Sequence, residues 1–198
     1  SAWAIRLSVY LSWRNFGEPE DTRYQHIRRR NEPFALKSLW IVFLLQAAIA
    51  AVIAAPIVVI AVENRPCDTA LYVGTGLSMV GLCIESLADW QLSQFRGDTA
   101  HTKAVLDTGL WYYSRHPNYF GDTLVWWGFY ICSLGGVVHS SHPVQALCLL
   151  SPVLMTVLLL NVSGVSLMEK TIPRRRPGYA RYIKSTSAFV PWPPKAHD

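Results

Sequence analysis

Residues 38–62 read SLWIVFLLQAAIAAVIAAPIVVIAV, and this stretch decides the class of fold. It holds no acidic or basic residue, and only Gln46 and Pro56 interrupt its apolar character. A helix rises about 1.5 Å per residue, so a stretch of this length can cross the roughly 30 Å of hydrocarbon in a bilayer. A helix on the surface of a soluble protein would instead carry a polar stripe at a period of about 3.6 residues. The stretch therefore predicts a transmembrane helix.

Three further apolar stretches have the same character, and they occupy residues 69–87, 123–138 and 144–168. The stretch 123–138 is short for a span and would need thinning of the bilayer or partners that cover its ends. Residues 1–13 are typical of the end of another span, and we expect helices upstream of this numbering. The predicted fold is all-α: a polytopic transmembrane helix bundle with four full spans and the end of an N-terminal span, forming a single domain over residues 1–198.

The charge of the chain is low and unevenly placed. Only 16% of the residues are charged, against roughly a quarter in ordinary soluble domains, and the net charge is +5. Nearly all basic residues fall in segments 14–37, 91–121 and 170–195, whereas the intervening turns 63–68 and 139–143 hold Arg65 alone. The positive-inside rule assigns the three basic segments to the cytoplasmic or equivalent side of a membrane. The pattern favours contact with anionic lipid over nucleic acid.

Ionisable residues near the end of the 69–87 stretch are candidates for function, because charge is costly to bury in a membrane. Glu85 and Asp89 are four residues apart and share a helix face, which Ser93 and Arg96 continue. This face suits a polar wall that binds a ligand. It equally suits a solvated helix end with an Asp–Arg pair, and the sequence leaves both interpretations open.

The densest group of polar side chains is the stretch TGLWYYSRHPNYFGD at residues 108–122. It combines a cation, an imidazole, an amide, a phenol and a carboxylate, which together could bind an amide, a ribose diol or a phosphate. The candidates are Arg115, His116, Asn118, Tyr119 and Asp122. The aromatic residues Trp111, Trp126 and Trp127 are interpreted instead as a belt at the membrane interface.

The basic tail, RRRPGYARY at residues 174–182, gives a second candidate region. Arginines beside tyrosines could hold a phosphorylated dinucleotide, because the planar guanidinium fork matches a phosphate. Lipid phosphate at the leaflet surface is the other open interpretation. No histidine or cysteine spacing predicts a metal site, and no glycine-rich nucleotide loop is present, so a cofactor site would be built from helix ends rather than from a Rossmann fold.

Several of these motifs together resemble those of the DUF1295 membrane proteins, which belong with the steroid 5α-reductase-like family (the C-terminal type of 3-oxo-5-alpha-steroid 4-dehydrogenase). The wider superfamily includes sterol reductases and isoprenylcysteine carboxyl methyltransferases. The resemblance covers almost the whole chain and rests on RLSVYL (6–11), EDTRY (20–24), ADWQL (88–92), SRHPNYFGD (114–122), PGY (177–179) and TSAFVPW (186–192).

The resemblance implies that the C-terminal half binds NADPH from the cytoplasmic side. Carried over by position, it implies cofactor contacts from Asp89 and Arg96 at a helix end and from Asn118 and Asp122 beside the nicotinamide. The neighbouring Arg115, His116 and Tyr119 would add to the second set. Further contacts would come from Tyr179, Arg181 and Tyr182 in the tail and from Tyr10 on an earlier helix. Two departures matter. Glu85 stands where those reductases carry an amide, and the stretch that supplies their substrate-polarising acid is absent or incomplete. The catalytic acid is therefore unassigned, with Glu20 and Tyr24 as candidates if the first loop folds over the site.

We expect an NADPH-dependent reductase that acts on a C=C bond of a lipid or steroid-like substrate entering from the bilayer. One alternative is a membrane methyltransferase dependent on S-adenosylmethionine, since Arg115-His116-Pro117 followed by an aromatic residue also occurs there. The other alternative is a non-catalytic subunit of a larger membrane assembly. Asn118 and Asp122 favour the reductase.

Overall fold

The computed structural model describes residues 2–17, 25, 28–31, 33–62, 67–97, 104–137, 142–162 and 164–195. These residues are helical or irregular, apart from an isolated parallel bridge between Ser114 and Ser187, and the all-α prediction is confirmed for them. The chain divides into two compact units, Ser1–Ala51 and Val52–Asp198. Each unit is described by itself, and the single domain expected from the sequence stays a prediction.

The first unit begins with α1 (Ala2–Asn15), which covers the N-terminal apolar stretch. Its later part contains α3 (Phe34–Ser38), the π-helical segment η1 (Leu39–Leu44) and the start of α4 (Leu45–Val62). These three elements follow one another without a break, and from Ser38 onward they contain no charged residue.

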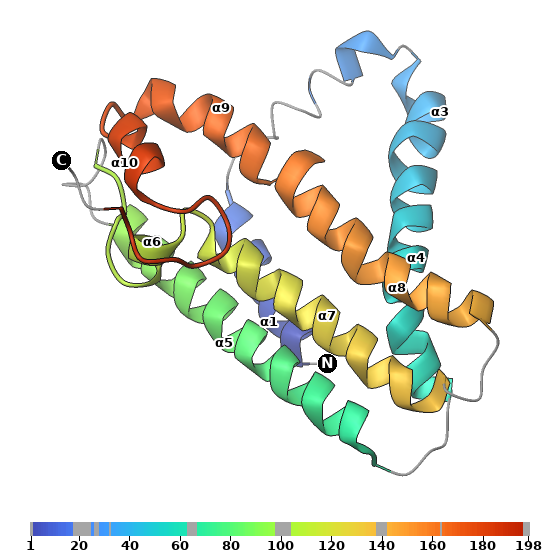
Figure 1. Cartoon of the computed structure of the whole chain (residues 1–198). Helices are drawn as coiled ribbons and strands as arrows, with labels where there is room; N and C mark the ends of the chain where they lie inside the picture. Colours follow the sequence, from blue (N-terminus) through green and yellow to red (C-terminus); the bar gives the residue numbers. More distant parts are fainter. Residues whose placement is uncertain are drawn as a thin grey trace. The chain divides into compact units, whose positions relative to one another are not determined.

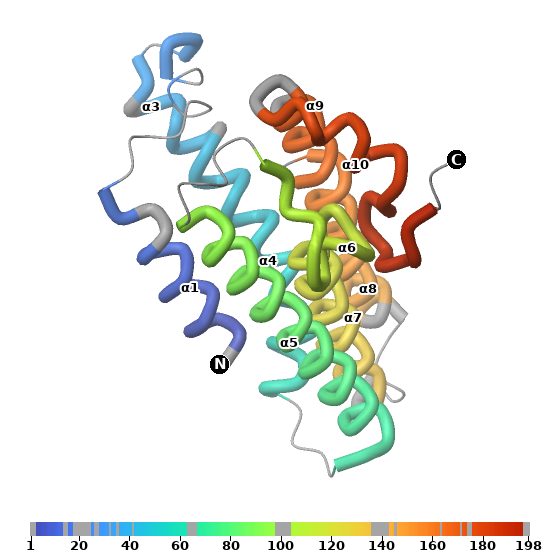
Figure 2. The backbone as a smooth tube through the Cα atoms, turned by 90° about the vertical axis from the view of Figure 1, so that its left-hand side faces the viewer, coloured from blue at the N-terminus to red at the C-terminus, as the bar shows by residue number. Residues whose placement is uncertain are grey.

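The second unit is organised around two antiparallel helices, α5 (Thr69–Gly97) and α7 (Pro117–Val137), which lie side by side in Figures 1 and 2. Glycines allow the two backbones to approach closely. A Cβ atom at Gly74 would lie 2.5 Å from the carbonyl oxygen of Gly128, and one at Gly81 would lie 2.5 Å from that of Gly121. The two glycines of each helix are seven residues apart, so they occupy one face, and a side chain on that face would separate the helices.

Helix α8 (His142–Val157) also packs against α7 and continues through the π-helical segment η3 (Leu158–Val162) into α9 (Val165–Arg175). A Cβ atom at Gly164 would lie 1.9 Å from the carbonyl oxygen of Leu159, so the change between η3 and α9 depends on a glycine. The short α10 (Tyr179–Ser185) and the segment 186–195 follow α9. Figure 2 shows this C-terminal segment beside α6 (Leu110–Tyr113).

Buried prolines divide two of the apolar helices into shorter hydrogen-bonded runs. Pro56 in α4 and Pro152 in α8 lack the N–H that would bond to the preceding turn. Hydroxyl groups bond to carbonyls close to both sites: Ser151 Oγ donates to Ile53 O at 2.6 Å, and Thr156 Oγ1 donates to Pro152 O at 2.6 Å. Side-chain hydroxyls are a common means of satisfying backbone groups in apolar helices.

Three of the four predicted spans correspond to helices long and apolar enough to cross a membrane, at Leu36–Val62, Thr69–Gly97 and Ala146–Lys170. The fourth, predicted at 123–138, is not confirmed. Its helix, α7, starts earlier, at Pro117, and begins with polar residues. Because α7 packs against both α5 and α8, protein covers much of its surface.

Candidate functional site

The candidate site lies where the C-terminal half of α5 meets the start of α7. Pro117 occupies the first position of α7, where its fixed φ and absent N–H are tolerated. The helix therefore starts directly after His116, and Asn118 falls in its first turn. The antiparallel arrangement places this turn beside Asp89 of α5.

A hydrogen bond between side chains joins the two helices at this point. Asn118 Nδ2 donates to Asp89 Oδ1 at 3.1 Å, and Asp89 is only 6% exposed. A carboxylate accepts hydrogen bonds, so this bond turns the amide oxygen of Asn118 away from Asp89. That oxygen is buried, and among the described residues it has no hydrogen-bond partner. The site thus presents a buried amide acceptor that a bound ligand could satisfy.

Two more carboxylates lie close to this pair. Glu85 precedes Asp89 by one helical turn, Asp122 follows Asn118 by one turn, and both are buried. A Cβ atom at Gly121 would lie 2.6 Å from the backbone nitrogen of Glu85, so the helix backbones nearly touch at this level. Burying carboxylates is costly, and a group of them inside apolar helices is a functional candidate. The structure therefore joins Asp89 to Asn118 and places the buried Glu85 and Asp122 one turn from them, while the binding of a ligand by these residues stays a prediction.

The segment before α7 is tied to α5. Leu110 N donates to Gln91 Oε1 at 3.1 Å, and Trp111 Nε1 donates to the carbonyl oxygen of Ala88 at 3.1 Å. Gly109 has a φ of 62° and lies against the Gln91 side chain, where a Cβ atom would be 2.4 Å from Nε2. Glycine is needed here for its backbone conformation.

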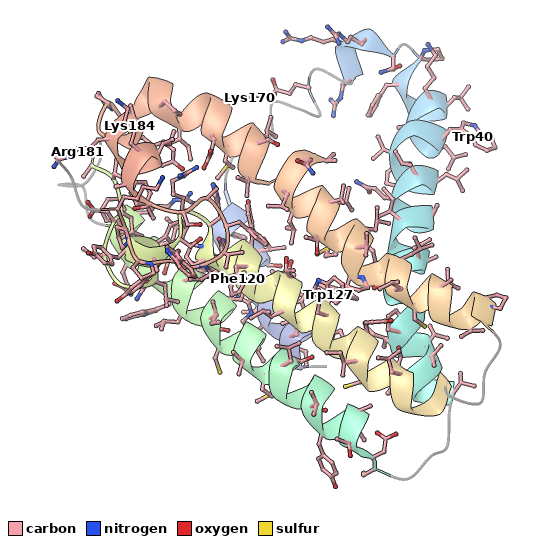
Figure 3. The ribbon with its side chains drawn as sticks, viewed as in Figure 1. Trp40, Phe120, Trp127, Lys170, Arg181 and Lys184 are labelled. Carbon is pink, nitrogen blue, oxygen red and sulfur yellow. The ribbon has the colours of Figure 1, made fainter. Side chains whose placement is uncertain are left out.

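The predicted membrane-interface belt is wrong for two of its three tryptophans. Trp111 and Trp126 are buried inside the second unit. Trp127 is half-buried, and its Nε1 donates to Thr156 Oγ1 of α8 at 3.4 Å (Figure 3). The sequence could not distinguish these packed indoles from lipid-facing ones, because both interpretations require an amphipathic ring beside an apolar helix.

Arg115 forms a buried network with the C-terminal part of the chain. Its Nε and Nη2 atoms donate to the two carboxylate oxygens of Glu169 at 2.7 Å and 3.0 Å, and Nη1 donates to the carbonyl oxygens of Ile183 and Thr186. Arg115 is 7% exposed. The guanidinium is therefore committed to protein acceptors, and its predicted contact with a cofactor has less support than that of Asn118. Glu169 was assigned no role from the sequence, because an acidic residue followed by a lysine at the end of an apolar stretch is typical of a solvated helix end.

His116 lies between this network and α7. Its Nε2 atom is 3.4 Å from Glu169 Oε1, and its ring stacks on Tyr119 with centroids 5.5 Å apart and planes at 2°. The imidazole is almost fully buried. His116 and Tyr119 are thus close to Asn118 in sequence, but they lie on a different face of the first turn of α7.

The tail residues divide into buried and exposed members. Tyr179 and Tyr182 are buried with centroids 5.6 Å apart, and the Tyr182 hydroxyl donates to the carbonyl oxygen of Trp111. Burial raises the pKa of Tyr179 to about 12 and that of Tyr182 further. Arg181 is exposed and projects outward from α10, as Lys184 does (Figure 3). The two tyrosines are therefore bound within the fold, and Arg181 is the member with a solvent-facing cation.

The C-terminal segment is held along residues 111–115 by backbone bonds. Arg115 N donates to Ser187 O at 2.8 Å, and Trp192 N donates to Tyr113 O at 2.9 Å. Ser114 Oγ donates to Phe189 O at 2.7 Å. These bonds keep the segment 186–192 beside the residues that directly precede α7.

The other predicted site residues belong to other parts of the chain. Tyr10 belongs to the first unit and is half-buried there. Arg96 lies in the last turn of α5 and is exposed. Glu20 and Tyr24 lie outside the described residues. Among the described residues, no group of histidine, cysteine, aspartate and glutamate side chains could hold a metal ion.

The chain was compared with known proteins through their families, sequences and structures. The family model described as "Protein of unknown function (DUF1295)" matches residues 1–186, which is most of the chain. No curated protein and no solved structure matches. The matched region includes every residue of the candidate site.

Proposed function

The chain belongs to the DUF1295 family, and from this premise we propose that it is a membrane-embedded reductase that uses NADPH to reduce a C=C bond of a lipid or steroid-like substrate. The observation that carries the proposal is the Asp89–Asn118 pair, whose buried amide oxygen has no partner among the described residues. The carboxamide of a nicotinamide ring offers N–H donors to such an acceptor.

The residues fit the two ends of this cofactor. Asp89, Asn118 and Asp122 would hold the nicotinamide half, and the exposed cations Arg96 and Arg181 would bind its phosphates. When bound, the cofactor supplies a hydride, which requires no protein nucleophile. The protein's own contribution is to orient the ring and exclude water, for which buried polar groups on rigid helices are suited.

The site also suits a substrate from the bilayer. Three helices are long and apolar enough to cross a membrane, and many of their apolar side chains are exposed. An apolar substrate could therefore reach the helix ends laterally, and the cofactor could enter from the side that carries the basic segments. We assign that side to the cytoplasm or its equivalent.

The test is ligand-dependent thermal stabilisation of the detergent-solubilised protein. A ligand at about 100 times its Kd stabilises a protein by about 2.7 kcal/mol, which corresponds to a rise in Tm of roughly 5–10 °C at this chain length. NADPH is expected to give this rise. Stabilisation by S-adenosylmethionine alone would favour a methyltransferase and exclude the proposal, and no response to either would favour a non-catalytic subunit.

A matched pair of variants assigns the response to the site. Asp89→Asn is expected to abolish the NADPH-dependent rise, because it changes the acceptor that orients Asn118. Asp68→Asn is the control: Asp68 Oδ1 accepts from Leu71 N at the other end of α5, about 30 Å away along the helix. This variant should keep the full rise. Equal responses of the two variants would place the cofactor elsewhere.

A further inference from the structure

A second buried polar atom without a partner lies deeper along α7, at Thr123. Its side chain is 5% exposed, and Oγ1 has no hydrogen-bond partner in the part of the chain that the structure describes. Burying a hydroxyl without a partner destabilises the folded state. The residue therefore needs an explanation that the Asp89–Asn118 pair does not supply.

Other hydroxyls in these helices behave differently. Thr156 Oγ1 donates to the carbonyl oxygen four residues earlier at 2.6 Å, and Ser133 Oγ donates to that of Tyr130 at 2.7 Å. Such bonds to the preceding turn are the usual solution for a hydroxyl on an apolar helix. Thr123 makes no such bond, so its hydroxyl remains available to something outside its own helix.

The packing of α7 defines the surroundings of Thr123. Two contacts bracket it: His116 lies 3.4 Å from Glu169, and Trp127 bonds to Thr156 at 3.4 Å. Because the two chain segments run antiparallel between these contacts, the level of Thr123 corresponds to the π-helical segment η3 (Leu158–Val162). π-helical segments interrupt the regular packing of a helix and are frequent at functional sites.

We propose that the Thr123 hydroxyl, at the level of the π-helical segment η3, is the hydrogen-bonding contact for a carbonyl or hydroxyl oxygen of a lipid-soluble ligand held between α7 and the α8–η3–α9 helix. Its apolar surroundings, including Trp126 one turn further on, suit the hydrocarbon part of such a ligand. The identification of this ligand with the substrate rests on the proposed function. A substrate with a conjugated carbonyl needs a hydrogen-bond donor for its carbonyl oxygen.

The test compares two probes and two variants in detergent micelles. The probes are a 4-en-3-one steroid and the same ring system without the ketone, and binding is measured by quenching of tryptophan fluorescence. The wild-type protein should bind the ketone about tenfold more tightly than the hydrocarbon. Thr123→Val should lose this preference, whereas Thr123→Ser, which keeps the hydroxyl, should retain it.

The control is Ser133→Ala, which removes a hydroxyl that is already bonded to the preceding turn of α7. This variant should lower Tm in the absence of ligand and keep the preference for the ketone. Thr123→Val should leave the Tm of the ligand-free protein unchanged or raise it, because it removes a buried hydroxyl without a partner. A fall in Tm as large as that of Ser133→Ala would show that the hydroxyl is satisfied within the fold and would overturn the inference.

Two other results would separate this inference from the proposed function. Equal binding of both probes by the wild-type protein refutes the Thr123 contact, whatever NADPH does. A ketone preference that depends on Thr123, without stabilisation by NADPH, supports the contact and refutes the reductase.

Discussion

The buried pair between Arg115 and Glu169 should be a main source of stability in the second unit. Glu169 accepts two bonds from the guanidinium, and the side chains of the two residues are 8% and 21% exposed. Removal of one partner from a buried ion pair typically costs about 3–5 kcal/mol, because a charge remains buried without compensation. The partial exposure of Glu169 places Glu169→Ala at the lower end, near 3 kcal/mol.

The expected change in Tm follows from the length of the chain. For about 200 residues, each kcal/mol shifts Tm by roughly 2–4 °C, so Glu169→Ala should lower Tm by roughly 6–12 °C. Tm is measured by tryptophan fluorescence on the purified protein in detergent. The neighbouring Lys170 is exposed, and Lys170→Ala is the matched control with an expected change within about 0.5 kcal/mol.

A second readout locates the effect. Glu169 fixes the guanidinium that also binds the carbonyl oxygens of Ile183 and Thr186, so Glu169→Ala should release the segment 183–192 and make it more sensitive to limited proteolysis. The reasoning is refuted if Glu169→Ala and Lys170→Ala unfold at the same temperature.

The remaining predictions concern helix packing and the buried tyrosines. Gly81→Val should destabilise the second unit by about 2 kcal/mol or more, because the space at Gly81 is filled by the backbone of α7, whereas Gly76→Val, with no atom within 4 Å, should change Tm little; equal effects would contradict the packing. In an alkaline titration followed by ultraviolet absorbance, Tyr179 and Tyr182 should stay protonated at about pH 11, because burial raises their pKa, to about 12 for Tyr179. Their raised pKa also predicts that their contribution to the free energy of unfolding is constant below about pH 10 and falls as the pH rises toward 12, because the tyrosines of the unfolded chain ionise first. Full ionisation of both tyrosines at pH 11 without unfolding would contradict their burial.

The sequence predicted part of the candidate site because that part is encoded locally. Asp89, Asn118 and Asp122 could be selected as costly polar residues at helix ends, and their motifs placed the chain in its family before any geometry was known. Glu169 and Thr123 could not be selected in the same way. A single acidic residue beside a lysine is typical of a solvated helix end, and a threonine in an apolar helix normally bonds to its own backbone.

The sequence by itself determined the helical class, three of the membrane-length helices and the family, because apolar character and helix propensity depend on residues close together in the chain. The tertiary structure alone decided which polar groups meet. Asn118 and Asp89 are 29 residues apart, and Arg115 and Glu169 are 54 apart. Their pairing depends on the antiparallel packing of α5 and α7 through glycines and on the glycine-dependent change of path at Gly164. The same packing buries Trp111 and Trp126, because burial is set by neighbouring helices rather than by the residue itself.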